Sequence, residues 1–521
     1  MGWNPIVWVQ TRLAGGPRTL AYLALGYVGV LIVFTSITYS LIDKSAVGRA
    51  DTIWLMIVSG AQALFLLLLA PSSIHRAVQR DFQTGMIESH RITPMSSLRV
   101  MLGYLVGPAA SPLVLFGVGL LAGGYFSTRN IVNLNSGAPL TASLLVGGWA
   151  TSQGLLLILA AMLCGISVLS AIAVQGGKFN IMGLIVAAGF LGGWSVVIAV
   201  PGAALLSGVM GGSVLLSTIF KGSAIAAGPA VLTAALLQAA FTVLFLFAAA
   251  RKFRAPDRAL FPLDLSFVLL AMWGVTLVLG MALQTPSPWM RNAFDRLYAV
   301  QIGSSLLAFM LVAIFTNAAA AADRLRLDRA AVFDRRLARG AALRSAAPVV
   351  TGLAAMGLTA LLIAVADREM FGAHLRVCIR EPMAWTAVSI AVLLSCWVDY
   401  NLCYIGRAYN AKPWLVVLVA WGLLKVAPPI ADGALREIMG EIYGEPWSGY
   451  GFLTAVSPVG TLLGAFPPTA ELIVGLVVQI LIAAVIAIIA RDAQRRLARR
   501  VTRTATADAS QADRSASPVR S

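Results

Sequence analysis

The sequence is short of charged residues. Asp, Glu, Lys and Arg make up 12% of its 521 residues, whereas 59% are hydrophobic, and the mean hydropathy is +0.84. A typical soluble domain has roughly 25% charged residues. A soluble fold of this length could not keep so much apolar surface from water, which excludes a cytosolic enzyme and a disordered chain. The composition predicts a polytopic membrane protein of the all-α class.

Residues that build metal and catalytic centres are also scarce. There are three histidines and four cysteines, and the cysteines lack the CxxC spacing of a zinc site or a redox motif. The phosphate-binding pattern GxxxxGK[ST] is absent, and so is the GxSxG elbow of serine hydrolases. The sequence therefore makes no case for an enzyme, a metal or a cofactor, and ATP cannot bind through a P-loop.

Long apolar runs dominate what is present. A helix that crosses a membrane needs roughly 20 apolar residues, and we count twelve such runs, with ten and fourteen as the bounds of the count. The runs are 20–42, 52–70, 100–125, 142–172, 181–200, 229–250, 262–283, 297–322, 347–366, 382–404, 413–431 and 469–490. The residues before the first run lack a small-residue cleavage site, so we expect no cleavable signal peptide.

The basic residues are distributed unevenly between the loops. With the N-terminus in the cytoplasm, 28 of the 39 Lys and Arg residues fall in cytoplasmic segments and 10 in external ones. Cytoplasmic loops of membrane proteins are enriched in Lys and Arg, so this count favours twelve spans with both termini cytoplasmic. The net charge of +17 then belongs to a face that meets anionic lipid, and it predicts no nucleic-acid partner.

The runs divide into two groups of six, residues 1–258 and 259–490, followed by a basic tail, 491–521. Each group has its main cytoplasmic loop after its second run, and each ends in a basic stretch. No sequence identity between the halves is visible, so the repeat is one of topology. In the tail we expect a helical continuation over 491–503 and disorder in the Ser- and Ala-rich remainder.

The first large cytoplasmic loop, 75–96, carries the most informative pattern. Its first part predicts one helix over 75–91, with an apolar strip formed by Phe82, Met86 and Ile87. Such a helix would lie along the membrane interface with the strip facing inward. On physical grounds alone, a plain interfacial loop with solvated charged sides explains the segment equally well.

A motif within this loop resembles a known family. It reads Asp81-x-x-x-Gly85-x-x-Glu88-x-x-x-x-Thr93-Pro94-x-Ser96. The motif resembles the loop after the second span of ABC-2 type ABC transporter permeases. The opening Asn4-Pro5-Ile6-Val7 is similar to the start of many such permeases, just before an interfacial elbow helix.

The resemblance covers roughly residues 1–258, a whole six-span unit, and implies a function. In that family this loop is a coupling helix that docks on a separate ATP-binding cassette subunit. Carried over to this chain, the coupling residues would be Asp81, Gly85, Glu88, Thr93 and Pro94. ABC-2 permeases resemble exporters as a class, which favours export. The loop 323–346 has no counterpart of the motif, so it stays open whether the two halves form one permease or the chain pairs as a homodimer.

Two charged residues lie inside predicted spans, Asp399 and Lys425. Charges at membrane depth are costly and usually face protein or water. Counted at about 1.5 Å per residue, Asp399 lies roughly 8 Å and Lys425 roughly 18 Å from the inner ends of their runs. Because their depths differ, a direct pair needs shifted boundaries. Two interpretations stay open. In the first, the two residues form an intramembrane polar site. In the second, Asp399 reaches the inner interface and the Lys425 side chain extends outward to the other interface.

These patterns predict the membrane-spanning permease subunit of an ABC transporter in the plasma or cell inner membrane. The alternative is an ion- or proton-coupled secondary transporter, which would need several intramembrane carboxylates or histidines. A membrane enzyme acting on lipid would need Asp, Glu or His clustered at one membrane face. The expected partners are the ATP-binding cassette subunit, the lipid bilayer and a transported substrate that the sequence does not identify.

Overall fold

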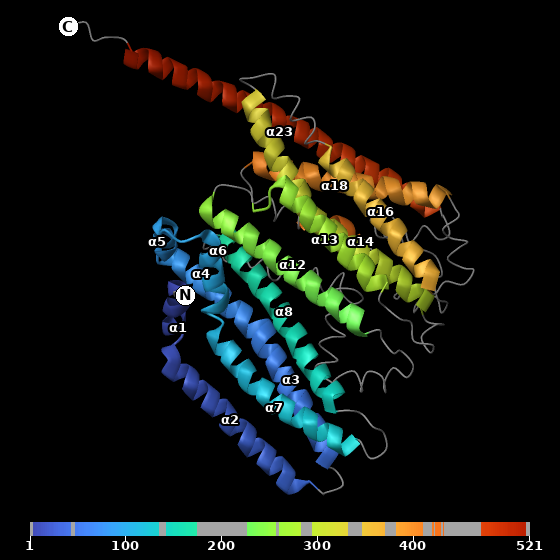
Figure 1. Cartoon of the computed structure of the whole chain (residues 1–521). Helices are drawn as coiled ribbons and strands as arrows, with labels where there is room; N and C mark the ends of the chain where they lie inside the picture. Colours follow the sequence, from blue (N-terminus) through green and yellow to red (C-terminus); the bar gives the residue numbers. More distant parts are fainter. Residues whose placement is uncertain are drawn as a thin grey trace, which may run out of the picture. The chain divides into compact units, whose positions relative to one another are not determined.

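The architecture is helical throughout the part of the chain that the structure describes (Figure 1). This part of the computed structural model comprises residues 4–42, 47–134, 142–174, 227–256, 260–282, 294–331, 346–369, 382–409, 419–420, 422–428, 431 and 470–516. Within these ranges every regular element is a helix and none is a strand. The predicted all-α class is therefore confirmed.

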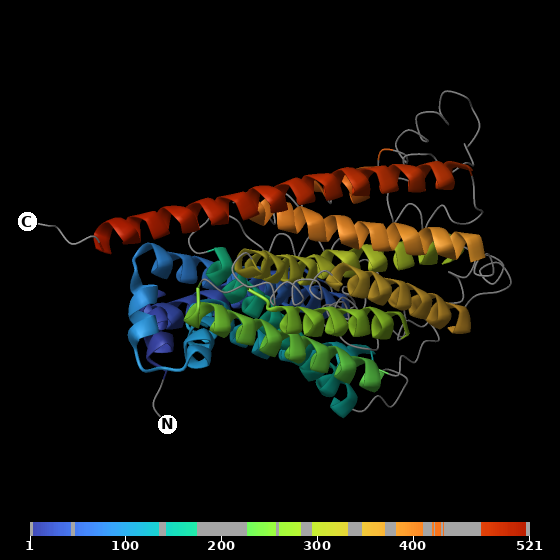
Figure 2. The same cartoon turned by 90° about the horizontal axis from the view of Figure 1, so that it is seen from above.

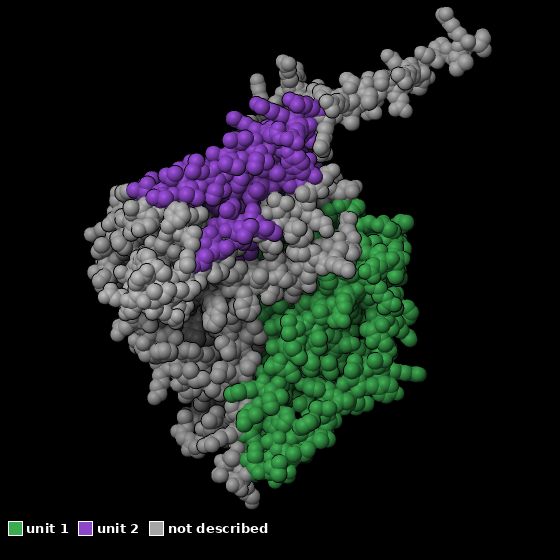
Figure 3. Space-filling model, turned by 180° about the vertical axis from the view of Figure 1, so that it is seen from behind, with its two compact units in different colours: residues 1–260, 283–289 green, residues 261–282, 290–521 purple. Residues whose placement is uncertain are grey.

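The chain forms two compact units (Figure 3). Unit 1 comprises the described residues of 1–260, and unit 2 comprises those of 261–282 and 290–521. The division falls near residue 258, where the sequence pattern also divides. That each unit is a six-span permease half stays a prediction.

Unit 1 contains short helices at one end and long helices elsewhere. Its elements are α1 (Pro5–Leu13), α2 (Gly16–Leu41), α3 (Val47–Leu64), the π-helical turn η2 (Phe65–Leu69), α4 (Ala70–Gln83), α5 (Met86–Ile92), α6 (Ser97–Val106), α7 (Ala110–Leu134), α8 (Ala142–Val174) and α12 (Ala227–Arg254). α3 packs on α7, and α8 packs on α12. The helices α1, α4, α5 and α6 gather at one end of the unit (Figures 1 and 2). We call these four helices the helical cap.

Unit 2 is built from longer helices. Its elements are α13 (Leu263–Ala282), α14 (Phe294–Ala331), α16 (Ala347–Glu369), α18 (Pro382–Ala408), the π-helical turn η4 (Gly422–Val426) and α23 (Ala470–Ala516). α18 lies along α23 (Figures 1 and 2), and α14 packs against both α16 and α18. Small side chains on α14 allow this close packing, since Ala320 and Ala321 are fully buried beside Tyr404 and Cys403.

Seven of the described helices are long and apolar enough to cross a membrane. They are Gly16–Leu41, Ile53–Gln83, Ala110–Arg129, Gln153–Ala173, Ala235–Arg254, Thr386–Ala408 and Ile473–Arg499. Shorter apolar helices cover Ser97–Val106, Leu263–Leu279 and Ala347–Leu362. The predicted run 181–200 and nine of the nineteen residues of 413–431 lie outside the described residues, so the total of twelve spans stays a prediction.

The outward faces of these helices are apolar, as lipid requires. Only 6% of the α2 span is buried, and its side chains Leu25, Ile32 and Phe34 expose 66%, 58% and 56% of their surface. In water such a surface would be a large hydrophobic patch, which soluble monomers rarely show. The exposed faces are therefore consistent with a membrane-embedded protein.

Two sequence predictions differ from the structure at helix boundaries. The run 100–125 is two helices, because α6 ends at Val106 and α7 starts at Ala110. Pro108 between them has no backbone N–H to donate and disfavours helix at the residue before it. In the tail, α23 continues to Ala516, whereas disorder was expected after residue 503. Adding a residue to a helix that already exists is much easier than nucleating one, and this segment is rich in alanine.

Candidate functional site

The candidate coupling segment contains two helices instead of the single helix predicted over 75–91. α4 ends at Gln83 and α5 starts at Met86. Gly85 between them has a φ of +72°, a left-handed conformation that costs an L-residue with a side chain about 1–2 kcal/mol. The Thr84 amide closes α4 on the Arg80 carbonyl at 2.9 Å. The glycine therefore redirects the chain into α5.

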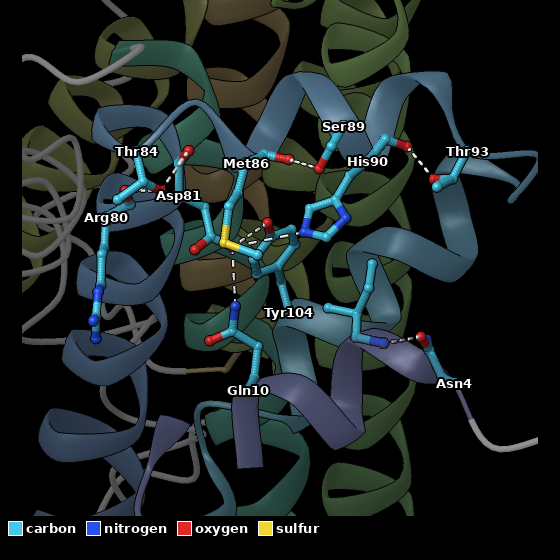
Figure 4. A network of polar contacts seen from close by, with 11 residues as sticks. Asn4, Gln10, Arg80, Asp81, Thr84, Met86, Ser89, His90, Thr93 and Tyr104 are labelled. Carbon is cyan, nitrogen blue, oxygen red and sulfur yellow. Dashed lines mark hydrogen bonds and ion pairs between the residues drawn. The ribbon is translucent and has the colours of Figure 1, made fainter. Parts of the chain in front are cut away.

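A buried carboxylate binds the helical cap together. Asp81 on α4 is 1% exposed and accepts hydrogen bonds from the Gln10 side-chain amide at 2.9 Å and the Tyr104 hydroxyl at 2.6 Å. The His90 ring on α5 lies 3.9 Å from the same carboxylate oxygen. These side chains come from α1, α6 and α5 and converge on Asp81 in Figure 4. We call Asp81, Gln10, Tyr104 and His90 the Asp81 latch.

α1 is fixed on α6 by close backbone approach. The Asn4 side chain caps α1 by accepting from the Ile6 amide at 3.1 Å, and it donates to the Arg99 carbonyl of α6 at 2.6 Å. A Cβ atom on Gly103 would lie 2.7 Å from the Ile6 Cβ, and one on Gly107 would lie 2.7 Å from the Gln10 Cβ. Real Cβ atoms do not approach this closely, so α1 can lie here only because both positions are glycine.

α5 is anchored on one side and exposed on the other. Its Ile87 is buried, and Arg91 donates to the Phe253 carbonyl at 3.0 Å with its guanidinium 5.5 Å from the Phe253 ring centre. Glu88 pairs with Arg91, yet its side chain is 62% exposed. Thr93 ends the helix by donating through its hydroxyl to the His90 carbonyl at 2.7 Å.

Apolar side chains around α5 face outward with Glu88. Met86 and Leu98 are 39% and 49% exposed, and Ile92 is 85% exposed. We call Met86, Glu88, Ile92 and Leu98 the α5 surface. Of the predicted apolar strip, Ile87 is buried within the protein and Met86 is on its surface, because the turn at Gly85 separates α5 from α4. That the strip faces the membrane stays a prediction.

The five residues of the motif fall into two groups. Asp81 is buried in the latch, where it cannot touch a docked subunit, and it could act on coupling only through the position of α4. Gly85, Glu88, Thr93 and Pro94 are all exposed. Gln10, Tyr104, Gly103 and Gly107 were not anticipated from the sequence. The spacing Gly103-x-x-x-Gly107 was the available signal, since small residues four apart let two helices approach closely.

Unit 2 contains a buried ion pair between the two charged residues of the predicted spans. The Lys425 Nζ lies 2.6 Å from the Asp399 carboxylate, and their side chains are 3% and 2% exposed. The depths counted along the sequence differed, so they did not predict a direct pair. That count ended the run of Asp399 at residue 404, whereas α18 continues to Ala408. Asp399 therefore lies about 14 Å from the end of its helix, closer to the depth counted for Lys425. Nearby, Asn317 and Thr351 are also fully buried, and the Asn317 amide donates to the Cys396 carbonyl at 3.3 Å.

A second charged cluster joins α2, α3 and α7 at the end of unit 1 away from the cap. Asp51 is fully buried, accepts from the Tyr39 hydroxyl and lies 3.6 Å from the Arg129 Nε. The Arg129 guanidinium stacks on the rings of Tyr39 and Tyr125 at 5.1 and 5.7 Å. Among the described residues, no group of three or more His, Cys, Asp or Glu side chains could hold a metal ion.

Comparisons with known proteins do not identify the chain. A scan against protein-family models, a search of curated proteins and a search of solved structures each found no match. The likeness to ABC-2 permeases is therefore carried by the residues of the loop 75–96 and the opening of the chain.

Proposed function

We propose that this chain is the membrane-spanning permease subunit of an ABC transporter, driven by a separate ATP-binding subunit and working as an exporter. The observation that carries this proposal is the geometry of α5. It is a short helix that presents Glu88 and exposed apolar side chains while its inner side is tied to the spans. A docking helix needs both an accessible surface and a firm connection to the parts that move.

The connection runs through two contacts. The Asp81 latch joins α5 and α4 to α1 and α6, and Arg91 joins α5 to the end of α12. α4 in turn continues from α3 through η2 with no loop between them. A push on α5 would therefore reach two spanning helices directly, which suits a rigid-body change between inward- and outward-facing states.

The orientation belongs to the same proposal. Twelve spans with both termini in the cytoplasm put the loop 75–96 on the side where ATP is available, and they put 28 of 39 basic residues there as well. The membrane that this orientation implies is the plasma membrane or the cell inner membrane. The basic end of α12, Arg251, Lys252 and Arg254, would mark the cytoplasmic border of that span.

Co-purification tests the proposal. The tagged full chain is expressed with a candidate ATP-binding cassette subunit, purified and reconstituted in lipid vesicles for an ATPase assay. Glu88→Lys reverses the exposed charge and should weaken binding of a basic groove at least 30-fold, since breaking a docked charge contact costs about 2–5 kcal/mol. Arg18→Glu, an exposed reversal at the start of α2, is the matched control. If Glu88→Lys and Gly85→Leu both leave association and ATPase stimulation intact, α5 is not the docking helix.

The buried pair in unit 2 favours a second candidate, an ion- or proton-coupled secondary transporter. Asp399 and Lys425 form a fully buried pair of ionisable groups, which is the kind of site that such transporters use. The two proposals differ in their energy source. Transport into vesicles that needs ATP and the partner subunit supports the permease, whereas transport driven by a proton gradient alone and lost in Asp399→Asn supports the alternative.

A further inference from the structure

Unit 1 contains a polar layer between two apolar clusters that α3, α7 and α8 build together. The first cluster, nearer the start of α3, consists of Trp54, Leu55, Val58, Phe126 and Trp149. The second cluster, where α3 continues into η2, consists of Leu66, Phe116, Leu156 and Ala160. On each of the three helices a short stretch separates the two clusters. The residues of these stretches therefore form a layer of their own.

Two glutamines occupy this layer. Gln62 on α3 and Gln153 on α8 each lie between the residues that their helix contributes to the two clusters. The corresponding position on α7 is Gly119, where a Cβ atom would lie 2.8 Å from the Gln62 Cγ, so glycine leaves the space that the Gln62 side chain fills. Gln62 is about 12–15 Å from either end of the apolar run 52–70, near the middle of the predicted span. We call Gln62, Gln153 and Gly119 the glutamine layer.

Both glutamines have a buried acceptor that no described residue satisfies. Gln62 and Gln153 are 0% and 4% exposed. The Gln62 amide nitrogen donates to the Phe116 carbonyl at 3.4 Å, but the two amide oxygens accept no hydrogen bond from the part of the chain that the structure describes. The indole N–H of Trp54, in the first cluster, is a buried donor that has no acceptor there either. Such atoms are costly, and the bilayer core supplies no water to relieve the cost. These three atoms are the groups that a ligand would meet.

The surroundings of the layer define the chemistry of that ligand. Residues 52–74, 110–128 and 142–174 contain no Asp, Glu, Lys or Arg, so these segments offer nothing to compensate a charged ligand. A hydroxyl group both donates and accepts, so it can serve an amide oxygen and the indole N–H. In the first cluster the rings of Trp54 and Phe126 stack with centroids 6.2 Å apart, and aromatic side chains pack well against a further ring.

We infer that the glutamine layer binds an uncharged apolar ring compound whose hydroxyl groups donate to the oxygens of Gln62 and Gln153. Within the proposed function, this compound is the class of substrate that is exported. That role rests on the permease assignment, whereas binding itself does not. The competing occupant is water held between the two glutamines, which would create no preference for a hydroxylated ligand.

Ligand binding to the purified full chain in lipid nanodiscs tests the inference. The probe is tritiated 2,7-dihydroxynaphthalene, and the reference is 2,7-dimethylnaphthalene, whose methyl groups are of similar size and make no hydrogen bond. The wild type should bind the dihydroxy compound saturably, above its partition into empty nanodiscs. The measured quantity is the dissociation constant of the dimethyl compound divided by that of the dihydroxy compound. Each hydrogen bond contributes about fivefold, so this ratio should fall about fivefold in Gln62→Met or Gln153→Met and about 25-fold in the double variant.

Gln238→Met is the matched control. Gln238 on α12 is 4% exposed, and its amide oxygen also has no donor among the described residues. It belongs to neither apolar cluster, so its replacement should leave the ratio unchanged. Methionine has nearly the shape of glutamine and removes an unpaired polar atom, so the variants should melt no lower than the wild type. A photolabel with an azide in place of one hydroxyl requires no variant, and it should modify α3, α7 or α8 of the wild type.

The outcomes separate this inference from the proposed function. The inference is overturned by absence of saturable binding to the wild type, by an unchanged ratio in the double variant or by labelling confined to other helices. An equal fall of the ratio in Gln238→Met also overturns it, because the preference would then not depend on the layer. Each of these results leaves the permease assignment standing, since the assay contains no ATP-binding subunit. If binding follows the expected pattern and no ATP-binding subunit associates with the chain, the binding site stands and the proposed function fails.

Discussion

Removing the Asp81 carboxylate should loosen the helical cap without touching the surface that a partner would contact. Asp81→Ala leaves the amide of Gln10 and the hydroxyl of Tyr104 without their acceptor, and both side chains are buried at 5% and 0% exposure. A buried donor without a partner costs about 1–3 kcal/mol. Two of them together should lower the free energy of opening the cap by about 2–6 kcal/mol.

Hydrogen exchange measured by mass spectrometry reports the free energy of opening for each helix of the cap. Protection falls tenfold for every 1.4 kcal/mol, so amides of α1 and α6 should exchange roughly 30-fold faster or more in Asp81→Ala. Asp81→Asn keeps one carbonyl acceptor and should show a smaller increase. Glu88→Ala removes only an exposed pair with Arg91 and should change exchange less than about fivefold, because such pairs contribute about 0–1 kcal/mol.

The distribution of faster exchange among the helices is as informative as the size of the increase. Faster exchange should be confined to α1, α4, α5 and α6, with α3 and α7 unchanged, because the latch joins only the cap helices. If Asp81→Ala exchanges like the wild type in α1 and α6, the latch does not hold the cap and the role assigned to Asp81 is wrong. If exchange rises equally in every helix of unit 1, Asp81 supports the whole unit rather than the cap.

Three further predictions follow from the packing and topology. Gly103→Ala places a Cβ against Ile6 and should lower the free energy of unfolding by about 1–3 kcal/mol. Gly117→Ala, which has open space around it, should not lower it. Equal melting temperatures of the two variants would refute the close approach of α1 and α6. Asp399→Ala should destabilise the protein by about 3–5 kcal/mol, because it leaves the buried Lys425 unpaired. The double variant with Lys425→Met should recover much of this stability. If it does not, the unpaired lysine is not the cause of the loss. With native cysteines removed, a cysteine at position 341 should react only with cytoplasmic reagent, and labelling from outside would end the twelve-span proposal.

Local chemistry made much of the fold predictable. The apolar runs fixed the positions of α2, α8, α12 and α18 within a few residues, since length and hydropathy alone decide whether a helix can cross a bilayer. The break at Pro108 and the turn at Gly85 were also encoded locally. Proline has no backbone N–H to donate, and glycine adopts a positive φ without steric cost. The single helix expected over 75–91 was wrong because apolar spacing was given more weight than a glycine in its middle.

Contacts between distant residues were beyond the sequence. Gln10 and Asp81 are 71 positions apart, and nothing in either segment indicates the other until α1 is placed on the glycines of α6. The pairing of Asp399 with Lys425 was left open for a different reason. The depth of Asp399 depends on where its helix ends, and α18 continues four residues beyond the apolar run, to Ala408. Hydropathy does not reveal such an extension, because a helix can continue beyond its apolar run.

The motif Asp81–Pro94 is better understood as two sets of residues with separate tasks. Asp81 and Gly85 shape the cap, one by binding donors from α1 and α6, the other by adopting a positive φ that turns the chain. Glu88 makes no contact with the latch and is largely solvated. A change in the first set should therefore alter docking and cap stability together, whereas Glu88→Lys should alter docking alone. Loss of docking in Glu88→Lys with unchanged cap stability would identify a coupling helix. An interfacial loop would lose cap stability when the first set is changed, and neither set would affect docking.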